Sequence, residues 1–424
     1  MAMINAPKGV EDILFPRASY YEEIEKKAGN FFSLYGYKKI MVPTFEKTEL
    51  FLRSVGQETD VGKQMYTFKD KGGRSISLRP EGTAGIVRAY VEHKIYAKEK
   101  NWKVYYAGPM FRYERPQAGR LREFYQIGVE CFGEESPWLD VEIIEMAHDF
   151  LKGMGLDNIQ VQVNSIGCKK CRYKYIEELK VYLGKYLDVL CSTCRRRFRY
   201  NPLRILDCKS ATCRAVLEKA PRIQDFTCSS CQEHFDKVTG GLCRLKIAHT
   251  INPYLVRGLD YYTRTIFEII SSYLGSQDAV CAGGRYDNLV EQLGGPPTPA
   301  TGFAIGVERL LFSLEKAGVD LSKPAPQGVF MATIGEKSVE EAIQVASIIR
   351  SQGIAVKINL TNKGLSSQLK QANRENFSWV LIIGEGEIRK GKFILKNMHS
   401  GMQQEIETEE FEVFSNFLKG DASS

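Results

Sequence analysis

The chain has 424 residues, 43% of them hydrophobic and 26% charged, and these proportions are typical of a globular protein and exclude a disordered one. It is too long for one ordinary core, so two or three domains are expected. A net charge of +7 permits a polyanionic partner but is too small to demonstrate one. No apolar run is long enough to span a membrane, and the first residues lack a signal peptide's basic and apolar regions, so we expect a cytoplasmic protein with no membrane partner.

The first predicted elements are a helix and a strand. Residues 18–35 place apolar side chains on one helical face, and Gly36 ends the pattern. The apolar run KKIMVPTFE at 38–46 follows, with Pro43 inside it. Because proline cannot donate a backbone hydrogen bond, this strand is expected at a sheet edge or an interface.

The middle of the chain contains further strand patterns separated by helical ones. Strands are predicted at 74–79, 103–108, 123–132, 159–165, 265–271 and 300–306, and helices at 138–151 and 304–317. The two kinds of element do not alternate regularly. This order favours an α+β fold with an antiparallel sheet over residues 1–320.

A cysteine-rich insertion is predicted at about 168–245. In a cytoplasmic chain such cysteines are metal ligands or reduced thiols rather than a disulfide framework. Nineteen residues separate the first two pairs, which fits a four-cysteine zinc site, and the last two pairs could form a second. Buried thiols without a metal, or redox-labile pairs, remain the alternative. The four close pairs are Cys168 with Cys171, Cys191 with Cys194, Cys208 with Cys213, and Cys228 with Cys231.

A domain boundary is predicted at GVDLSKPAPQ, residues 318–327, which carries two prolines and a serine between periodic segments. Over 327–424 the pattern changes to strands that alternate regularly with helices. Strands are predicted at 328–334, 354–360 and 379–384, and helices at 337–351 and 364–376. This alternation predicts a small parallel α/β domain with helices on both faces.

Three arginine-bearing stretches, far apart in the chain, indicate a single nucleotide site. They are FRYERPQAGRLREFYQIG at 111–128, RGLDYYTRTIFE at 257–268 and GFAIGVERL at 302–310. The planar fork of arginine matches phosphate with two hydrogen bonds, and its flat face stacks on a base. One such arginine alone is more often a partner in a surface ion pair, whereas three signatures in this order favour a triphosphate site.

These stretches, together with AGGRYD at 282–287, resemble the signature blocks of the bacterial-type histidyl-tRNA synthetases, which are class II aminoacyl-tRNA synthetases. The resemblance begins at PKGVEDILFP, residues 7–16, and continues into the carboxyl-terminal domain. It implies a class II catalytic domain over 1–320 and an anticodon-binding α/β domain over 327–424. It also implies a homodimer in which the segment around Pro43 packs across the two-fold axis.

The activity implied by the resemblance is that of a histidine–tRNA ligase. L-Histidine and ATP, as its Mg²⁺ complex, would give histidyl-adenylate, and the histidyl group would then pass to the 3′ end of tRNA(His). The implied catalytic residues are Arg112 and Arg257, which would hold the α-phosphate. The implied ATP-binding residues are Arg112, Glu114, Arg120 and Arg309.

The resemblance also implies how histidine is held. The ammonium group needs acceptors, and the neutral imidazole needs one acceptor and one donor. Glu130 would accept from the ring and Tyr262 would donate to it, although adjacent tyrosines are otherwise more often core aromatics. The implied histidine-binding residues are Glu81, Gly82, Thr83, Arg112, Gln126, Glu130, Arg257, Tyr261, Tyr262 and Tyr286.

Two alternative functions were considered. The first is a regulatory paralogue, the histidyl-synthetase-like subunit of ATP phosphoribosyltransferase, but such paralogues generally lack the anticodon-binding domain and parts of the signatures, and both are present here. The second is a class II synthetase for another amino acid, and the segments RGLDYY and AGGRYD argue against it. The basic run RRRFRY at 195–200 is interpreted as solvated surface, with contact to the tRNA acceptor arm as the alternative.

Overall fold

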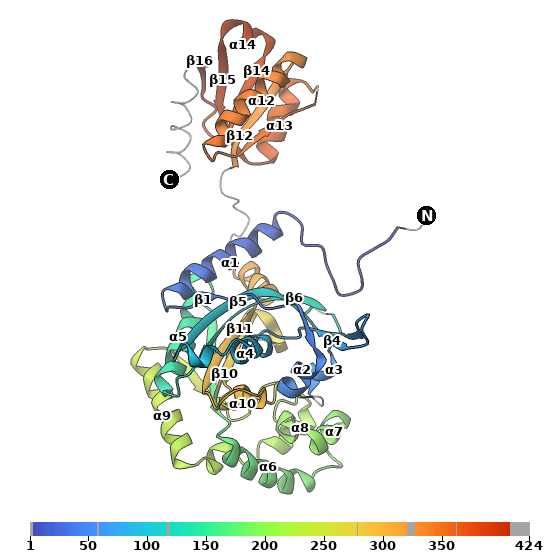
Figure 1. Ribbon diagram of the computed structural model, residues 1–424, viewed down its shortest axis with the longest axis vertical. Coiled ribbons are helices and arrows are strands. Elements are labelled where there is room, and N and C mark those ends of the chain that lie inside the picture. The colour runs from blue at the N-terminus through green and yellow to red at the C-terminus, as the bar shows by residue number, and fades with distance from the viewer. Residues whose placement is uncertain are drawn as a thin grey trace. The chain divides into compact units, whose positions relative to one another are not determined.

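The fold was analysed in a computed structural model, which describes residues 3–56, 59–116, 119–277, 279–319, 327–361 and 363–407 (Figure 1). Contacts between Cα atoms divide the chain into two units, Met1–Asp320 and Leu321–Ser424. The boundary predicted at 318–327 lies largely outside the described residues. None of the helices in the described ranges has the length and apolar character needed to cross a membrane.

An eight-stranded sheet is the frame of the first unit, in the order β1-β5-β6-β11-β10-β9-β7-β8. The inner pairs are antiparallel, while β1 pairs with β5 and β8 pairs with β7 in parallel. The predicted α+β fold with an antiparallel sheet is therefore confirmed, with one short parallel strand at each edge. The strands are β1 (Lys38–Lys39), β5 (Trp102–Phe111), β6 (Glu123–Phe132), β7 (Ile159–Ser165), β8 (His249–Ile251), β9 (Thr263–Ser271), β10 (Ala279–Arg285) and β11 (Ala300–Gly306).

The strand predicted over 38–46 is wrong in its middle. Only β1 joins the large sheet, and β2 (Phe45–Lys47) pairs with β4 (Ser75–Leu78) in a small sheet that β3 (Thr67–Lys69) completes. Pro43 lies between the two strands, where its missing N–H breaks no ladder. The apolar run is therefore shared between two sheets.

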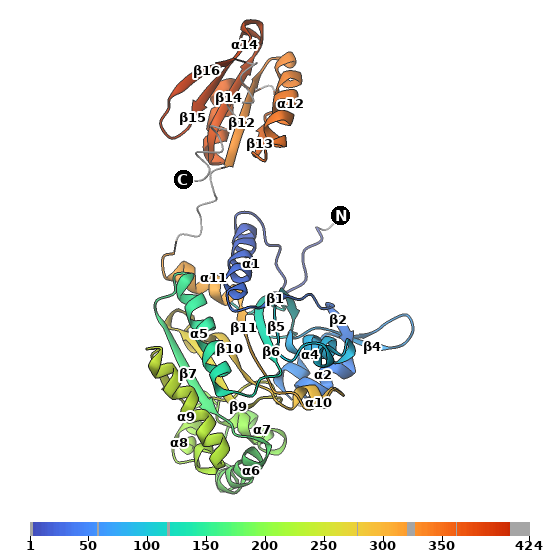
Figure 2. The same ribbon diagram turned by 60° about the vertical axis from the view of Figure 1, so that its left-hand side comes forward.

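Helices cover both faces of the large sheet (Figures 1 and 2). Alternate side chains of β5 divide between these faces, as the pleat of a strand requires. Tyr105 packs against Phe32 of α1, with ring centroids 5.9 Å apart, whereas Tyr106 belongs to the core that includes Tyr90 of α4. The helices are α1 (Arg17–Ser33), α2 (Thr48–Val55), α3 (Asp60–Lys63), α4 (Thr83–Glu92), α5 (Pro137–Gly153), α10 (Leu289–Gln292) and α11 (Val307–Lys316), with 3-10 turns η1 (Ile95–Ala97) and η4 (Ser272–Gln277).

The cysteine-rich insertion is helical and lies between β7 and β8 in the chain. Figures 1 and 2 show its helices gathered at one end of the unit. Leu179 and Leu183 are fully buried, and they share one core with residues of the large sheet. The insertion is thus packed against the part of the unit that contains the large sheet. It comprises α6 (Lys169–Gly184), α7 (Ser192–Tyr200), η2 (Pro202–Ile205), α8 (Ala211–Leu217), η3 (Ile223–Phe226) and α9 (Ser229–Arg244).

Arg285, at the end of β10, connects the large sheet to α5. Its side chain is fully buried and forms ion pairs with Asp140 of α5 at 2.7 Å and with Asp287 at 3.2 Å. It also donates to the carbonyl of Ser136, just before α5, at 2.9 Å. A buried guanidinium is tolerated only when it is paired with charge, and these contacts fix Arg285 and with it the adjacent Tyr286.

The second unit is a five-stranded sheet in the order β13-β12-β14-β15-β16. Alternate residues of its strands face different helices: Val329 and Leu381 pack with α12, and Phe330 and Val380 pack with α13. The predicted helices on both faces are therefore present. The elements are β12 (Gln327–Ile334), α12 (Glu336–Ser351), β13 (Val356–Ile358), α13 (Leu365–Arg374), β14 (Phe377–Gly384), α14 (Glu385–Lys390), β15 (Lys392–Asn397) and β16 (Gln403–Glu407).

The prediction of a parallel sheet in this unit is only partly right. Strands β13, β12 and β14 are parallel, but β15 and β16 were not predicted and run antiparallel. Each of these strands buries only one face. Its exposed positions carry charged and amide side chains, so the hydrophobic pattern is too weak to predict a strand. The six-residue α14 is also too short to carry the chain across the sheet for a parallel return.

Candidate active site

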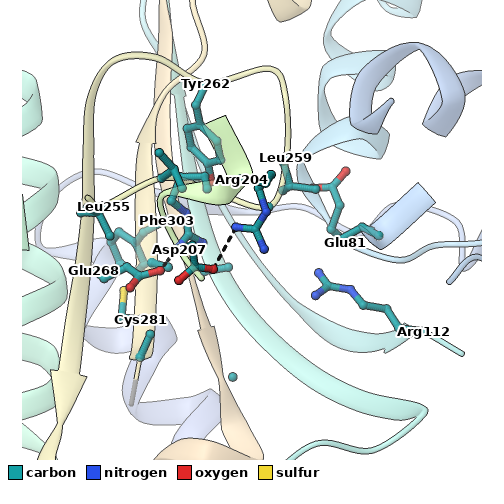
Figure 3. Close-up of a pocket in the computed structure, with 18 of the residues that line it drawn as sticks. Glu81, Arg112, Arg204, Asp207, Leu255, Leu259, Tyr262, Glu268, Cys281 and Phe303 are labelled. Atoms are coloured by element: carbon teal, nitrogen blue, oxygen red, sulfur yellow. Dashed lines mark hydrogen bonds and ion pairs between the residues drawn. The ribbon is translucent and has the colours of Figure 1, made fainter. Parts of the chain in front are cut away.

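A cavity of about 880 Å³ lies on the side of the large sheet that carries α4. Every predicted ATP- or histidine-binding residue except Gly82 lines it. In the view of Figure 3, Glu81 and Arg112 lie on one side of the cavity and Glu268 and Cys281 on the other. Residues more than two hundred positions apart in the chain therefore line one cavity.

Gly82 and Glu81 shape the start of α4, beside the cavity. Gly82 is the N-cap of α4, and a Cβ atom there would collide with the ring of Tyr106, so only glycine fits. The Glu81 carboxylate accepts from the backbone N–H of Thr83 at 2.7 Å and of Ala84 at 2.9 Å. Burial raises the pKa of Glu81, while these hydrogen bonds act in the opposite direction.

Glu130, on β6, is the most deeply buried acid of the cavity. Thr83 Oγ1 donates to its Oε1 at 2.6 Å, and the Tyr286 hydroxyl donates to its Oε2. Burial raises the pKa of Glu130 to about 8, although both hydrogen bonds lower it. Gly302 of the neighbouring β11 lies opposite, where a Cβ atom would collide with Oε2. The carboxyl is therefore fixed between β11, the start of α4 and the residue that follows β10.

Three tyrosines form an aromatic wall beside Glu130. The ring centroids of Tyr261 and Tyr262 are 4.7 Å apart, and those of Tyr261 and Tyr286 are 5.7 Å apart. All three are buried. Burial raises the pKa of each, so their hydroxyl groups stay protonated and can donate.

Three arginines reach the cavity from three different segments. Arg112 Nε donates to the Pro80 carbonyl at 2.8 Å, Arg309 Nη1 donates to the Ala279 carbonyl at 2.6 Å, and Arg257 forms an ion pair with Glu268. These partners fix the direction of each guanidinium. Burial, and next the charge of Arg120, lower the pKa of Arg309 to about 10.

The loop before β6 adds a fourth arginine. Arg120 pairs with Glu114 at 3.1 Å, and both side chains line the cavity. Arg112, Arg120 and Arg309 thus gather in one place, where the charges of Arg120 and Arg112 lower the pKa of Arg309 and those of Glu114 and Glu268 raise it. An anion that enters this side of the cavity meets an excess of positive charge.

The sequence did not indicate a second wall of the cavity, which comes from the insertion. It carries four basic side chains and Asp207, with Arg204 and Asp207 paired at 3.2 Å. Only Arg197 belongs to the basic run at 195–200, where Arg195, Arg196 and Arg199 are exposed as expected. The basic residues are Arg197, Arg204, Lys209 and Arg214.

The eight paired cysteines form two clusters, but not those predicted. Cys168 and Cys171 meet Cys228 and Cys231, while Cys191 and Cys194 meet Cys208 and Cys213. The predicted combination of the first two pairs is wrong. The 16-residue α6 carries the chain about 24 Å away from the first pair, and the start of α9 returns to it.

Comparison with known proteins identifies the family. The family model described as histidyl-tRNA synthetase matches residues 9–170 and 207–310, and an anticodon binding domain model matches 328–414. The chain belongs to the histidyl-tRNA synthetase family. A histidine–tRNA ligase of Halothermothrix orenii is 48% identical over 404 residues, which cover 95% of this chain and 96% of that protein. The family predicted from the signature blocks is therefore confirmed.

Solved structures agree with this assignment. The apo histidyl-tRNA synthetase of S. aureus has a TM-score of 0.82 at 36% identity, with 97% of this chain and 100% of that chain covered. An ATP phosphoribosyltransferase regulatory subunit/histidyl-tRNA synthetase from Bacillus halodurans has a TM-score of 0.67 at 22% identity, covering 91% and 99% of the two chains. At 22% identity the second likeness shows a shared fold alone, whereas the histidine–tRNA ligase is 48% identical over 95% of this chain. The regulatory alternative is therefore not favoured.

We predict that Glu130 makes stability depend on pH. Its carboxyl titrates at about 8 in the folded chain and at 4.5 as a free side chain, so its stabilising contribution is complete below pH 4.5 and is lost as the pH rises to 8. Relative to Glu130→Gln, the free energy of unfolding of the wild type should fall by at most about 4 kcal/mol between pH 5 and 8. Urea denaturation of both proteins at three pH values measures this difference, and parallel profiles would contradict the prediction.

Proposed function

We propose that this protein is a histidine–tRNA ligase, which activates L-histidine with ATP in the cavity and transfers the histidyl group to the 3′ end of tRNA(His). The observation that carries the proposal is the convergence of Arg112, Arg257 and Arg309 on one cavity that also contains a polar, aromatic pocket. Activation joins two anions, a carboxylate and the α-phosphate of ATP, so fixed cations at that point are the main requirement.

On the phosphate side, Arg112 and Arg257 would hold the α-phosphate. Both are partly buried and held by one fixed acceptor each, so little reorganisation is needed as charge develops on the phosphate. Arg309 would hold the γ-phosphate and the adenine, with Glu114 and Arg120 beside it. ATP would enter as its Mg²⁺ complex, and Glu114 is a carboxylate on this side whose oxygens suit that cation.

On the histidine side, Glu81, Thr83 and Gln126 would surround the ammonium group. Gln126 Oε1 is buried and has no hydrogen-bond partner among the described residues, so it is an acceptor that the substrate can satisfy. Glu130 would accept from the imidazole N–H and Tyr262 would donate to the other ring nitrogen. An apolar analogue would leave these buried groups unpaired, which is a strong basis for rejecting it.

The remaining partners follow from the same proposal. The domain over 327–424 would bind the anticodon stem of tRNA(His), and the protein would act in the cytoplasm, where aminoacylation of tRNA takes place. The fold of this domain alone would not indicate such a partner. Its match to an anticodon binding domain model supports the proposal.

Pyrophosphate exchange with each of the twenty amino acids, followed by charging of tRNA, tests the function. We expect exchange with histidine alone and transfer to tRNA(His) alone. Exchange with a different amino acid would assign another specificity. Exchange with none, from a folded protein that binds ATP, would support the regulatory alternative.

We predict that Arg257→Ala lowers histidine-dependent exchange by several hundred-fold while the protein remains folded. Loss of one preorganised donor to a developing charge costs about 3–4 kcal/mol. Arg74→Ala is the matched control, because Arg74 is exposed and pairs only with Asp70 within its own turn. Its exchange rate should equal that of the wild type.

A second variant separates two explanations of this loss. Removal of Arg257 takes away an ion-pair partner of Glu268, and repulsion between this carboxylate and the triphosphate could by itself slow the reaction. The double variant Arg257→Ala/Glu268→Gln removes that charge. If the guanidinium itself is required, the double variant stays defective; recovery to within a few-fold of the wild type would contradict the proposed role.

A homodimer is also part of the proposal. Met41 is 85% exposed and Phe45 is 56% exposed on either side of Pro43, beside the short edge strand β1. Such an apolar segment at a sheet edge is typical of an interface. We predict that Met41→Glu/Phe45→Glu converts a dimer to a monomer in analytical ultracentrifugation, because two carboxylates would be buried without partners.

Leu360→Glu is the control for the dimer test. Leu360 is 67% exposed and lies in the other unit, so this variant should sediment as the wild type does. A monomeric wild type at micromolar concentration, or a double variant that remains dimeric, would contradict the proposed interface.

A further inference from the structure

The first cysteine cluster joins the starts of two helices. Cys168 is the N-cap of α6 and Cys228 is the N-cap of α9. The bonds between them are reciprocal: the Cys168 N–H donates to Cys231 Sγ at 3.2 Å, and the Cys228 N–H donates to Cys171 Sγ at 3.1 Å. Backbone N–H groups at helix N-termini stabilise thiolate rather than thiol.

The second cluster shares part of this arrangement between α7 and α8. Cys191 is the N-cap of α7, and its N–H donates to Cys213 Sγ, in the first turn of α8, at 3.2 Å. Cys208 precedes the N-cap of α8, Ser210, and its Sγ lies 3.9 Å from Cys191 Sγ. Cys194 and Cys213 are fully buried. In both clusters, therefore, the N–H of a cysteine N-cap donates to a cysteine in the first turn of another helix.

The separations between sulfur atoms decide what these clusters suit. Four thiolates at about 2.3 Å from a tetrahedral zinc ion lie about 3.8 Å from one another. All four sulfur atoms of each cluster lie within 4.8 Å of one another, and three of the separations are 3.6 Å for Cys168 with Cys171, 4.0 Å for Cys171 with Cys231 and 3.9 Å for Cys191 with Cys208. A disulfide requires about 2.05 Å, and all eight cysteines are free. The spacing therefore fits one ion in each cluster.

We propose that the insertion binds two structural Zn²⁺ ions, one held by Cys168, Cys171, Cys228 and Cys231 and the other by Cys191, Cys194, Cys208 and Cys213. Tetrahedral sites with four sulfur ligands favour zinc among the common divalent metals. Both sites are closed, since four protein ligands leave no position for water, and this is typical of structural zinc.

The first zinc ion would brace the segment that carries Arg257 and Tyr262. Arg172 follows Cys171 directly, and its Nη1 donates to the carbonyls of Asp260 at 2.9 Å and Tyr262 at 3.1 Å. These hydrogen bonds connect the first turn of α6 to the segment that carries Arg257 and Tyr262. Fixing this turn fixes the aromatic wall of the cavity.

The second zinc ion would hold the other wall. Cys191 and Cys208 line the cavity, as do Arg204, Asp207 and Lys209. Asn201, at the end of α7, donates to the Asp260 side chain at 2.8 Å, so this site supports the same segment from a second direction. The consequence for activity rests on the proposed function, whereas the metal content does not.

Metal analysis of the full chain, purified under reducing conditions without chelator, tests the proposal directly. We expect two zinc ions per chain by elemental analysis. The single variants Cys171→Ser and Cys194→Ser should each retain one zinc ion. Cys243→Ser is the matched control, because Cys243 is exposed on α9 and belongs to neither cluster, and it should retain two.

Thiol reactivity of the wild type gives a second measurement that does not depend on how the variants fold. With both sites loaded, an aqueous thiol reagent should modify Cys243 rapidly and leave the clusters protected. Cys228 is exposed, and Cys168, Cys191 and Cys208 are partly exposed, so they should react once a chelator has removed the metal. Re-addition of Zn²⁺ should restore protection.

The outcomes separate this proposal from the proposed function. Loss of the zinc ion held by Cys191, Cys194, Cys208 and Cys213 should slow histidine-dependent exchange by roughly 10- to 100-fold. This is the range of loss when residues that orient the groups of a site are removed. Absence of stoichiometric zinc, iron in its place, or disulfides in the non-reduced protein would each overturn the metal sites. Two zinc ions in a chain that shows no exchange would instead contradict only the catalytic function.

Discussion

The structure depends on holding several like charges together around one cavity. Arg112, Arg257 and Arg309 come from segments remote in the chain, and each guanidinium is held by a protein partner, two by backbone carbonyls and one by Glu268. Burial and the neighbouring Arg120 lower the pKa of Arg309 to about 10, so its surroundings disfavour its charge. A triphosphate relieves this repulsion, so the same arrangement that costs stability in the free protein favours the anionic substrate.

The opposite side of the cavity is built by close backbone approach rather than by charge. Gly82 lets α4 begin against the ring of Tyr106, and Gly302 lets β11 pass beside Glu130. With Thr83 and Tyr286 donating to both oxygens of Glu130, the carboxyl has one fixed orientation. Any side chain larger than hydrogen at either glycine would displace the groups proposed to hold histidine. Arg285, buried with Asp140 and Asp287, secures this side from beneath.

Features that depend on the local sequence pattern were predicted well. Features that depend on which distant segments meet in the folded chain were predicted poorly. The long strands β5 and β6 and the helices α5 and α12 have clear periodicity, and the arginine stretches carry their residues in recognisable order. The pairing of the cysteines could not be predicted, because each close pair fits the same ligand spacing and only the course of α6 decides which pairs meet. Strands β15 and β16 were missed because one buried face leaves a weak signal. Arg204, Asp207 and Lys209 gave no signal at all, since they reach the cavity only through the fold of the insertion.

The short helices of the insertion need tertiary contacts to be stable, and residues of the insertion itself supply them. The histidyl-tRNA synthetase family model passes over residues 171–206, yet this segment contributes Arg197 and Arg204 to the cavity. Its helices are short, α8 having only seven residues, and short helices are marginal without tertiary support. Leu179 and Leu183 anchor α6 in the common core, and Leu203, Ile205 and Leu206 anchor the 191–214 wall in the same core. Two closed four-cysteine sites would add to this support, because a structural metal contributes folding free energy directly. Under the zinc proposal, the cysteines would keep this wall at a fixed distance from the arginines.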